Sequence, residues 1–308
     1  MSETPSRKDL SDMSLTRTSA VAASAVLLGA LATGPAAAAP AATTTACTMT
    51  VGSVTAGGDI GYSNITAGSP ITAKQYTGVH MFTPGITRLS TTWVRNPKSS
   101  GGDLASAEVM LNTNLYSAWY GTDKTGKPIS GFSNSGKNYQ GYTYDENASD
   151  RSDGVVDYTY RLRSDGALYR LQWHWTDFPY TTNTRFNGFS AVKTMALISA
   201  TSTYDTFLAN TRAGALYTIH IPHAAGKQPI VKKIRTSTWQ TFESLVAQRC
   251  GAQSTLLTAI DKDTGTAYLY AVSHGATVIK GLGKVPGTYK DPVYYLYTST
   301  SVPPLYGE

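Results

Sequence analysis

The sequence has 308 residues, and 26 Lys and Arg against 20 Asp and Glu give it a formal net charge of +6. Only 15% of its residues are charged whereas 10% are aromatic, a composition that argues against intrinsic disorder. Its many Tyr and Gly residues favour strands and the turns between them. The one basic cluster, Lys227 to Arg235, is expected to be a solvated edge strand, and no nucleic-acid-binding motif accompanies it.

The first 41 residues predict a secretory signal peptide. Met1–Ser19 is polar and carries three basic residues, and Ala20–Ala32 is an uncharged apolar run. A string of small residues follows and ends at Ala39-Pro40-Ala41, where cleavage is expected. The apolar run is shorter than the roughly 20 residues that span a bilayer. We therefore expect a secreted, extracellular protein outside the membrane; an uncleaved anchor or a disordered leader is the alternative.

A short phrase recurs along residues 42–308, which are expected to form the folded domain. It reads Gly-Ala-Leu-Tyr at residues 166–169 and 214–217, and weaker copies occur elsewhere. Each copy follows an apolar stretch and a turn, a pattern typical of a β-hairpin. The tyrosines of the five copies are Tyr62, Tyr116, Tyr169, Tyr217 and Tyr268, spaced by 54, 53, 48 and 51 residues.

This spacing predicts the fold. A repeat of roughly 40–50 residues with several strands in each unit is typical of a β-propeller. Five copies predict an all-β fold with about five four-stranded blades closed into a ring. A β-sandwich with chance Leu-Tyr matches is the alternative.

The two cysteines predict one disulfide. An even pair in an exported protein favours a bridge between Cys47 and Cys250. Cys47 precedes Tyr62 by 15 residues and Cys250 precedes Tyr268 by 18, so both lie at similar places in the first and last units. In a closed ring these units are neighbours, and the bridge would hold them together. No further soft ligand lies nearby, so no zinc site is expected.

The Gly-x-Leu-Tyr phrase, with its Asp/Gly turn and its period of about 50 residues, resembles the tachylectin-type β-propeller family. The alanine-rich leader and Thr-rich start of the mature chain are similar to those of secreted actinobacterial proteins. The resemblance implies a lectin for N-acetylated amino sugars, whose partner is a carbohydrate or a cell-surface glycan. We expect the protein to be a monomer. The repeats are degenerate, so five equivalent sites are not expected.

A lectin site needs an aromatic face with polar groups beside it. Trp173 and Trp175 would share one face of a strand, with His174 opposite. The alternative is that such rings fill the space between blades. The candidate ligand-binding residues are Trp119, Tyr120, Trp173, Trp175, Tyr217, His220 and Tyr268.

The sequence carries no nucleophile elbow, metalloprotease motif or nucleotide-binding glycine loop. No catalytic residue, metal or cofactor is therefore expected. The acidic stretch from Asp145 to Asp153 predicts a solvated surface loop rather than a calcium site, since it lacks the Gly and terminal Glu of an EF-hand. An extracellular propeller enzyme (a polysaccharide lyase or glycoside hydrolase) and a protein-interaction scaffold remain the alternatives.

Overall fold

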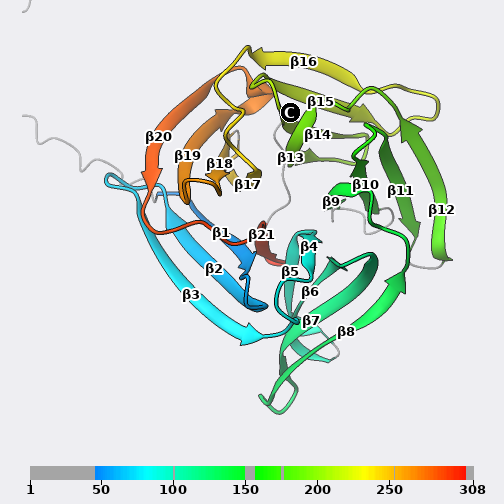
Figure 1. Ribbon diagram of the computed structural model, residues 1–308, viewed down its shortest axis with the longest axis vertical. Coiled ribbons are helices and arrows are strands. Elements are labelled where there is room, and N and C mark those ends of the chain that lie inside the picture. Colours follow the sequence, from blue (N-terminus) through cyan, green and yellow to red (C-terminus); the bar gives the residue numbers. More distant parts are fainter. Residues whose placement is uncertain (1–45, 100, 150–156, 175–176, 253, 303–308) are drawn as a thin grey trace, which may run out of the picture. The chain divides into compact units, whose positions relative to one another are not determined.

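The computed structural model describes residues 46–99, 101–149, 157–174, 177–252 and 254–302 (Figure 1). The predicted signal peptide, residues 1–41, lies outside the described residues. The described chain forms strands β1 to β21 and one short 3-10 turn, His274–Ala276. The all-β prediction is confirmed. No helix in this part of the chain is long and apolar enough to cross a membrane.

Three of the sheets have four strands each, and every strand pairs antiparallel with the next along the chain. The first consists of β9 (Tyr142–Ala148), β10 (Asp157–Arg163), β11 (Leu168–His174) and β12 (Asp177–Phe186). The second consists of β13 (Val192–Ala200), β14 (Tyr204–Thr211), β15 (Leu216–Pro222) and β16 (Ile230–Arg235). The third consists of β17 (Ser244–Cys250), β18 (Ser254–Asp261), β19 (Thr266–Ser273) and β20 (Ile279–Val285).

The fourth sheet has nine strands in the order β3-β2-β1-β21-β5-β6-β7-β8, with β4 paired to β6. Its centre is β21, which pairs antiparallel with β1 and parallel with β5. The last strand of the chain thus lies beside the first. The strands are β1 (Thr48–Val54), β2 (Asp59–Thr66), β3 (Thr72–His80), β4 (Thr87–Ser90), β5 (Trp93–Ser99), β6 (Gly102–Leu111), β7 (Asn114–Asp123), β8 (Pro128–Gly136) and β21 (Val293–Ser299).

Burial differs between the strands of the second sheet. Its first two strands, β13 and β14, are buried on both faces. The last strand, β16, is mostly exposed and carries Lys232 and Lys233 at the sheet edge. This confirms the prediction of a lysine-protected edge strand.

Neighbouring sheets pack through their first strands. The contacts run from β4 to β9, from β9 to β13, from β13 to β17, from β17 to β21 and from β21 to β4. Aromatic rings fill the space between sheets, as where Tyr160 meets Phe207 at 4.9 Å between ring centroids. Neighbouring sheets therefore pack face to face and bury their side chains in common clusters (Figure 1).

One backbone hydrogen bond recurs at each hairpin. Each segment that leads into the first strand of a group carries an aromatic residue. The backbone amide of this residue donates to a carbonyl in the preceding group, in the hairpin turn between its second and third strands. In four of these turns the accepting residue is a glycine with positive φ, which lacks a Cβ to strain. The pairs are Phe82 with Gly58, Tyr139 with Thr113, Phe189 with Gly166, Trp239 with Gly214 and Tyr289 with Gly265.

This hydrogen bond sets the register of the recurring tyrosines. Three residues after the accepting carbonyl stand Tyr116, Tyr169, Tyr217 and Tyr268. In the first hairpin the same position is Gly61, and Tyr62 lies one residue beyond. Side chains alternate between the faces of a strand, so Tyr62 points to the opposite face, where it stacks on Tyr76 with centroids 4.9 Å apart.

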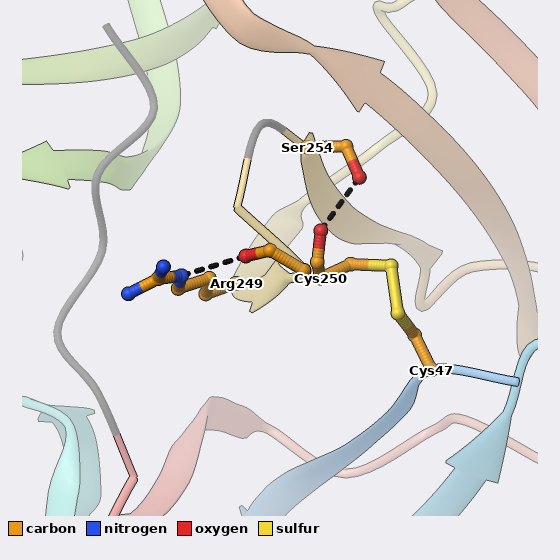
Figure 2. The surroundings of a disulfide bond; sticks show 5 residues. Cys47, Arg249, Cys250 and Ser254 are labelled. Atoms are coloured by element: carbon orange, nitrogen blue, oxygen red, sulfur yellow. Dashed lines mark hydrogen bonds between the residues drawn. A yellow bond between two sulfur atoms is a disulfide. The ribbon is translucent and has the colours of Figure 1, made fainter. Parts of the chain in front are cut away.

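Cys47 and Cys250 form a disulfide, as predicted (Figure 2). Cys47 lies just before β1 and Cys250 ends β17, so the bridge joins two strands that also contact each other. The Ser254 hydroxyl donates to the Cys250 carbonyl at 2.7 Å, which supports the turn beside the bridge. The bond closes a separation of 203 residues.

We expect the Cys47→Ser/Cys250→Ser variant to fold with a free energy of unfolding lower by about 2–5 kcal/mol, because the unfolded chain regains the freedom of a long loop. Thermal unfolding with and without a reductant measures this effect. Reductant should lower the midpoint of the wild type and leave that of the variant unchanged. Equal midpoints for the oxidised wild type and the variant would contradict the prediction.

Candidate functional site

Trp119 and Tyr120 lie on opposite faces of β7. Tyr120 packs against Trp93, with ring centroids 5.1 Å apart, and belongs to the core of the nine-stranded sheet. The Trp119 ring lies over Gly131 of β8, where an added Cβ would come within 2.7 Å of the ring. Tyr120 therefore fills space between strands, the alternative that the sequence left open, whereas Trp119 remains half-buried.

Trp173 is part of β11 and pairs with Asp157 of β10. Trp175 lies outside the described residues. Their shared use as an aromatic face thus stays a prediction.

Tyr217 and His220 occupy opposite faces of β15. The Lys233 ammonium lies over the Tyr217 ring, 5.6 Å from its centroid. The His220 ring contacts Thr206 through Nδ1 at 3.1 Å and packs on Tyr204 at 4.4 Å. Burial lowers the pKa of His220, which favours its neutral form.

Tyr268 on β19 is exposed and contacts Phe242 at 6.2 Å between ring centroids. Each of the candidate residues that the structure describes lies on the third strand of a group of four, namely β7, β11, β15 or β19. Of the predicted residues whose side chains the structure describes, none lines either of the two cavities described below.

The acidic stretch predicted as a loop is part of strand β9 as far as Ala148, and this prediction was wrong. Asp145 is buried beside Arg161, whose Nε donates to it at 3.0 Å. Arg161 also donates to Glu108 of β6 at 2.7 Å. A buried guanidinium is stable only when paired, so Asp145 and Glu108 keep Arg161 ionised between two groups of strands. Among the described residues, no three metal-ligating side chains form a cluster.

A cavity of about 150 Å³ lies among the first strands β4, β9, β13, β17 and β21. Glu146 is part of its wall, and its carboxylate accepts from the amides of Thr92 at 2.8 Å and Asn147 at 2.9 Å. Burial raises the pKa of Glu146 to about 7 despite these hydrogen bonds. Glu146 therefore changes its charge near neutral pH.

Glu243 is a second carboxylate of this cavity. It accepts from the Lys193 ammonium at 2.6 Å and from the Lys262 amide at 2.8 Å. Both of its oxygens are thus used to join β13, β17 and the end of β18. Glu146, Glu243 and Asp145, the third carboxylate of this cavity, are thus all engaged in hydrogen bonds within the domain.

A second cavity, of about 230 Å³, lies between the β1–β3 hairpins and the segment 286–292 that leads into β21. We call it the Gly61 cavity. Its wall is polar and aromatic, with hydroxyls, one amide side chain and one carboxylate. It is lined by Val51, Ser53, Thr55, Gly61, Tyr62, Ser63, Gln75, Tyr76, Thr77, Thr288, Tyr289, Asp291 and Tyr294.

The missing side chain at Gly61 accounts for this cavity. In the third and fifth hairpins, the tyrosine at the same position contacts an aromatic residue at the start of the first strand of its own group, Tyr142 of β9 or Phe242 just before β17. At Gly61 an added Cβ would lie 2.5 Å from the Ser53 hydroxyl and 3.7 Å from Oδ2 of Asp291. Both polar groups thus border the space that a tyrosine would fill.

The wall of the Gly61 cavity is fixed before any ligand binds. Gln75 donates to the Thr288 carbonyl at 3.0 Å and accepts from its amide at 3.3 Å. The hydroxyls of Ser63 and Tyr289 share a hydrogen bond of 3.1 Å. These bonds hold segment 286–292 against β2 and β3, which lowers the entropy cost of binding.

Sequence analysis missed the Gly61 cavity because Tyr62 was taken as the first recurring tyrosine. The spacing from the accepting glycine would have revealed the shift, since Tyr169 and Tyr217 both follow their glycine by three residues and Tyr62 follows Gly58 by four.

No protein-family model matches the sequence, and no curated protein matches it. Among solved structures, the chain is similar to the BP39L lectin from Burkholderia pseudomallei, with 13% sequence identity and a TM-score of 0.42 over 78% of this chain and 70% of the lectin. A likeness of this degree assigns neither a family nor a ligand. The resemblance to the tachylectin-type family therefore stays a prediction.

Glu146 should make stability depend on pH. Its pKa of about 7 in the folded state is higher than the value of about 4.3 for a free glutamate. The stability that the protonated Glu146 adds to the folded state is therefore fully present below about pH 4.3. It is lost as the pH rises through about 7.

We expect Glu146→Gln to be more stable than the wild type on the alkaline side, because the neutral amide oxygen can still accept from Thr92 and Asn147 without a buried charge. Thermal unfolding of both proteins across this pH range measures the difference. The slope should be shallower in Glu146→Gln without vanishing, because burial also raises the pKa of Asp145. An equal slope in both proteins would contradict the assignment.

Proposed function

We propose that the protein is a secreted, monomeric, carbohydrate-binding β-propeller whose ligand is an amino-sugar glycan of a cell wall or cell surface. The observation that carries this proposal is the Gly61 cavity, with Tyr289 and Tyr294 in its wall beside several hydrogen-bonding groups. Rings that pack on the C–H surface of a sugar, beside polar groups that bond its hydroxyls, are the chemistry of a saccharide site.

The propeller with five blades is supported by how the strands group. The nine-stranded sheet divides at the parallel β21–β5 contact into β21-β1-β2-β3 and β5-β6-β7-β8, which with the other three sheets gives five groups of four. The first strands β9, β13, β17 and β21, together with β4, which precedes β5 and also pairs with β6, contact one another in an order that returns to its start. In such a ring, β21 completes the first blade and joins the two ends of the domain.

Secretion is supported by two independent features. The leader has the three zones of a signal peptide. The Cys47–Cys250 bridge is of a kind that persists in oxidising compartments. An external ligand such as a glycan fits this location.

The size of the cavity supports a small ligand. About 230 Å³ is less than the range of about 300–1,000 Å³ typical of drug-sized ligands. The space suits one sugar ring, with the rest of a glycan chain outside.

We expect Gly61→Tyr to fold and to bind saccharides at least about tenfold more weakly than the wild type, because the new ring occupies the cavity. The backbone at Gly61 is not left-handed, and the Ser53 hydroxyl can rotate away from the new Cβ. Titration calorimetry against a panel of neutral and amino-sugar oligosaccharides measures this loss.

Asn64→Tyr is the matched control. It adds the same ring to the same strand at an exposed position on the opposite face, so its binding should equal that of the wild type. Two results would overturn the proposal: no saturable binding by the wild type at millimolar saccharide, or equal binding by Gly61→Tyr and Asn64→Tyr.

A further inference from the structure

The Gly61 cavity has a single charged group. Among the residues that the structure describes, Asp291 is the one carboxylate that lines the cavity, and no Lys, Arg or His lines it. Oδ2 of Asp291 lies 3.7 Å from the Cβ position at Gly61, so this oxygen faces the cavity. The backbone amide of Asp291 donates to the Tyr294 hydroxyl at 2.9 Å, which fixes the residue in place.

The lysines near Asp291 contact other groups. The Lys290 side chain lies over Gly265, with Cε 2.7 Å from the Cβ position of that glycine. The Lys262 ammonium donates to the Pro292 carbonyl at 2.9 Å, and the Lys74 ammonium lies 5.1 Å from the centroid of the Tyr76 ring. In the part of the chain that the structure describes, no salt bridge involves Asp291.

A ligand that fills the cavity removes water from this carboxylate. A carboxylate that loses water without gaining a donor carries a free-energy cost, and an ionised donor forms the stronger hydrogen bond with it. An ammonium offers three donors and the opposite charge. An acetamide offers one neutral donor, and an acidic sugar would bring a second negative charge.

We propose that the Gly61 cavity selects a sugar with a protonated primary amine, that is, a de-N-acetylated amino sugar, over its N-acetyl form, with Asp291 as the residue that determines this specificity. The inference rests on the proposed carbohydrate-binding function. It adds the chemical class of the ligand and the group that recognises it.

Calorimetry with glucosamine oligosaccharides and their N-acetylated counterparts tests the inference, in a buffer acidic enough to keep the amine protonated. The wild type should bind the amine form about tenfold more tightly, as a charge-assisted hydrogen bond implies. Added salt should reduce this preference, because it screens the partly exposed charge pair. Asp291→Asn should bind both forms with similar affinity.

Asp263→Asn is the matched control. It removes the same charge from an exposed turn of the β18–β19 hairpin, which does not line the cavity. The control should keep the preference of the wild type for the amine.

Three outcomes separate the two proposals. A preference for the amine that is lost in Asp291→Asn and kept in Asp263→Asn supports the inference. Equal binding of both sugars by the wild type, or a preference that survives in Asp291→Asn, overturns the inference and leaves the saccharide site standing. Binding of neither sugar, nor of any other in the panel, overturns the proposed function itself.

Discussion

The hydrogen bond from an aromatic amide to the carbonyl of a hairpin turn is the constraint on which the rest of the domain depends. It occurs in all five hairpins, from Phe82 and Gly58 to Tyr289 and Gly265. Buried amides must find a partner, so each bond fixes where the incoming segment meets the hairpin. Four of the five aromatic rings are buried, and they hold this position by packing as well.

The position three residues beyond the carbonyl lies on the third strand of a group, and in two hairpins its side chain meets the start of the first strand of the same group. A tyrosine there fills the space, as Tyr169 and Tyr268 do. Gly61 leaves it open, so the Gly61 cavity arises from one local change in an otherwise repeated frame. A cavity lined by several polar groups is a binding site more readily than an apolar void of the same size, because it can be hydrated when empty.

The strands, the edge strand at Lys232 and the Cys47–Cys250 bridge could be predicted, because each depends on local alternation, charge or cysteine count. The cavity could not, since it depends on which face a side chain takes, and a shift of one residue at Tyr62 reverses that face. The sequence did not predict the strand at Asp145, because a run of acidic residues is typical of a solvent-exposed loop. The burial of Asp145 depends on its tertiary partner Arg161, which the sequence does not reveal.

The Gly61 cavity also links ligand binding to the integrity of the domain. One wall comes from β1, β2 and β3, near the start of the described chain, and the other from segment 286–292 and β21, near its end. A ligand contacts both walls only while β21 is paired with β1. Under the proposed function, binding would stabilise this pairing, by about 2.7 kcal/mol at a ligand concentration one hundred times Kd. The disulfide also holds β1 in place, because it links Cys47, just before β1, to Cys250 at the end of β17 (Figure 2). The disulfide and a bound ligand would therefore both stabilise the position of β1 beside β21.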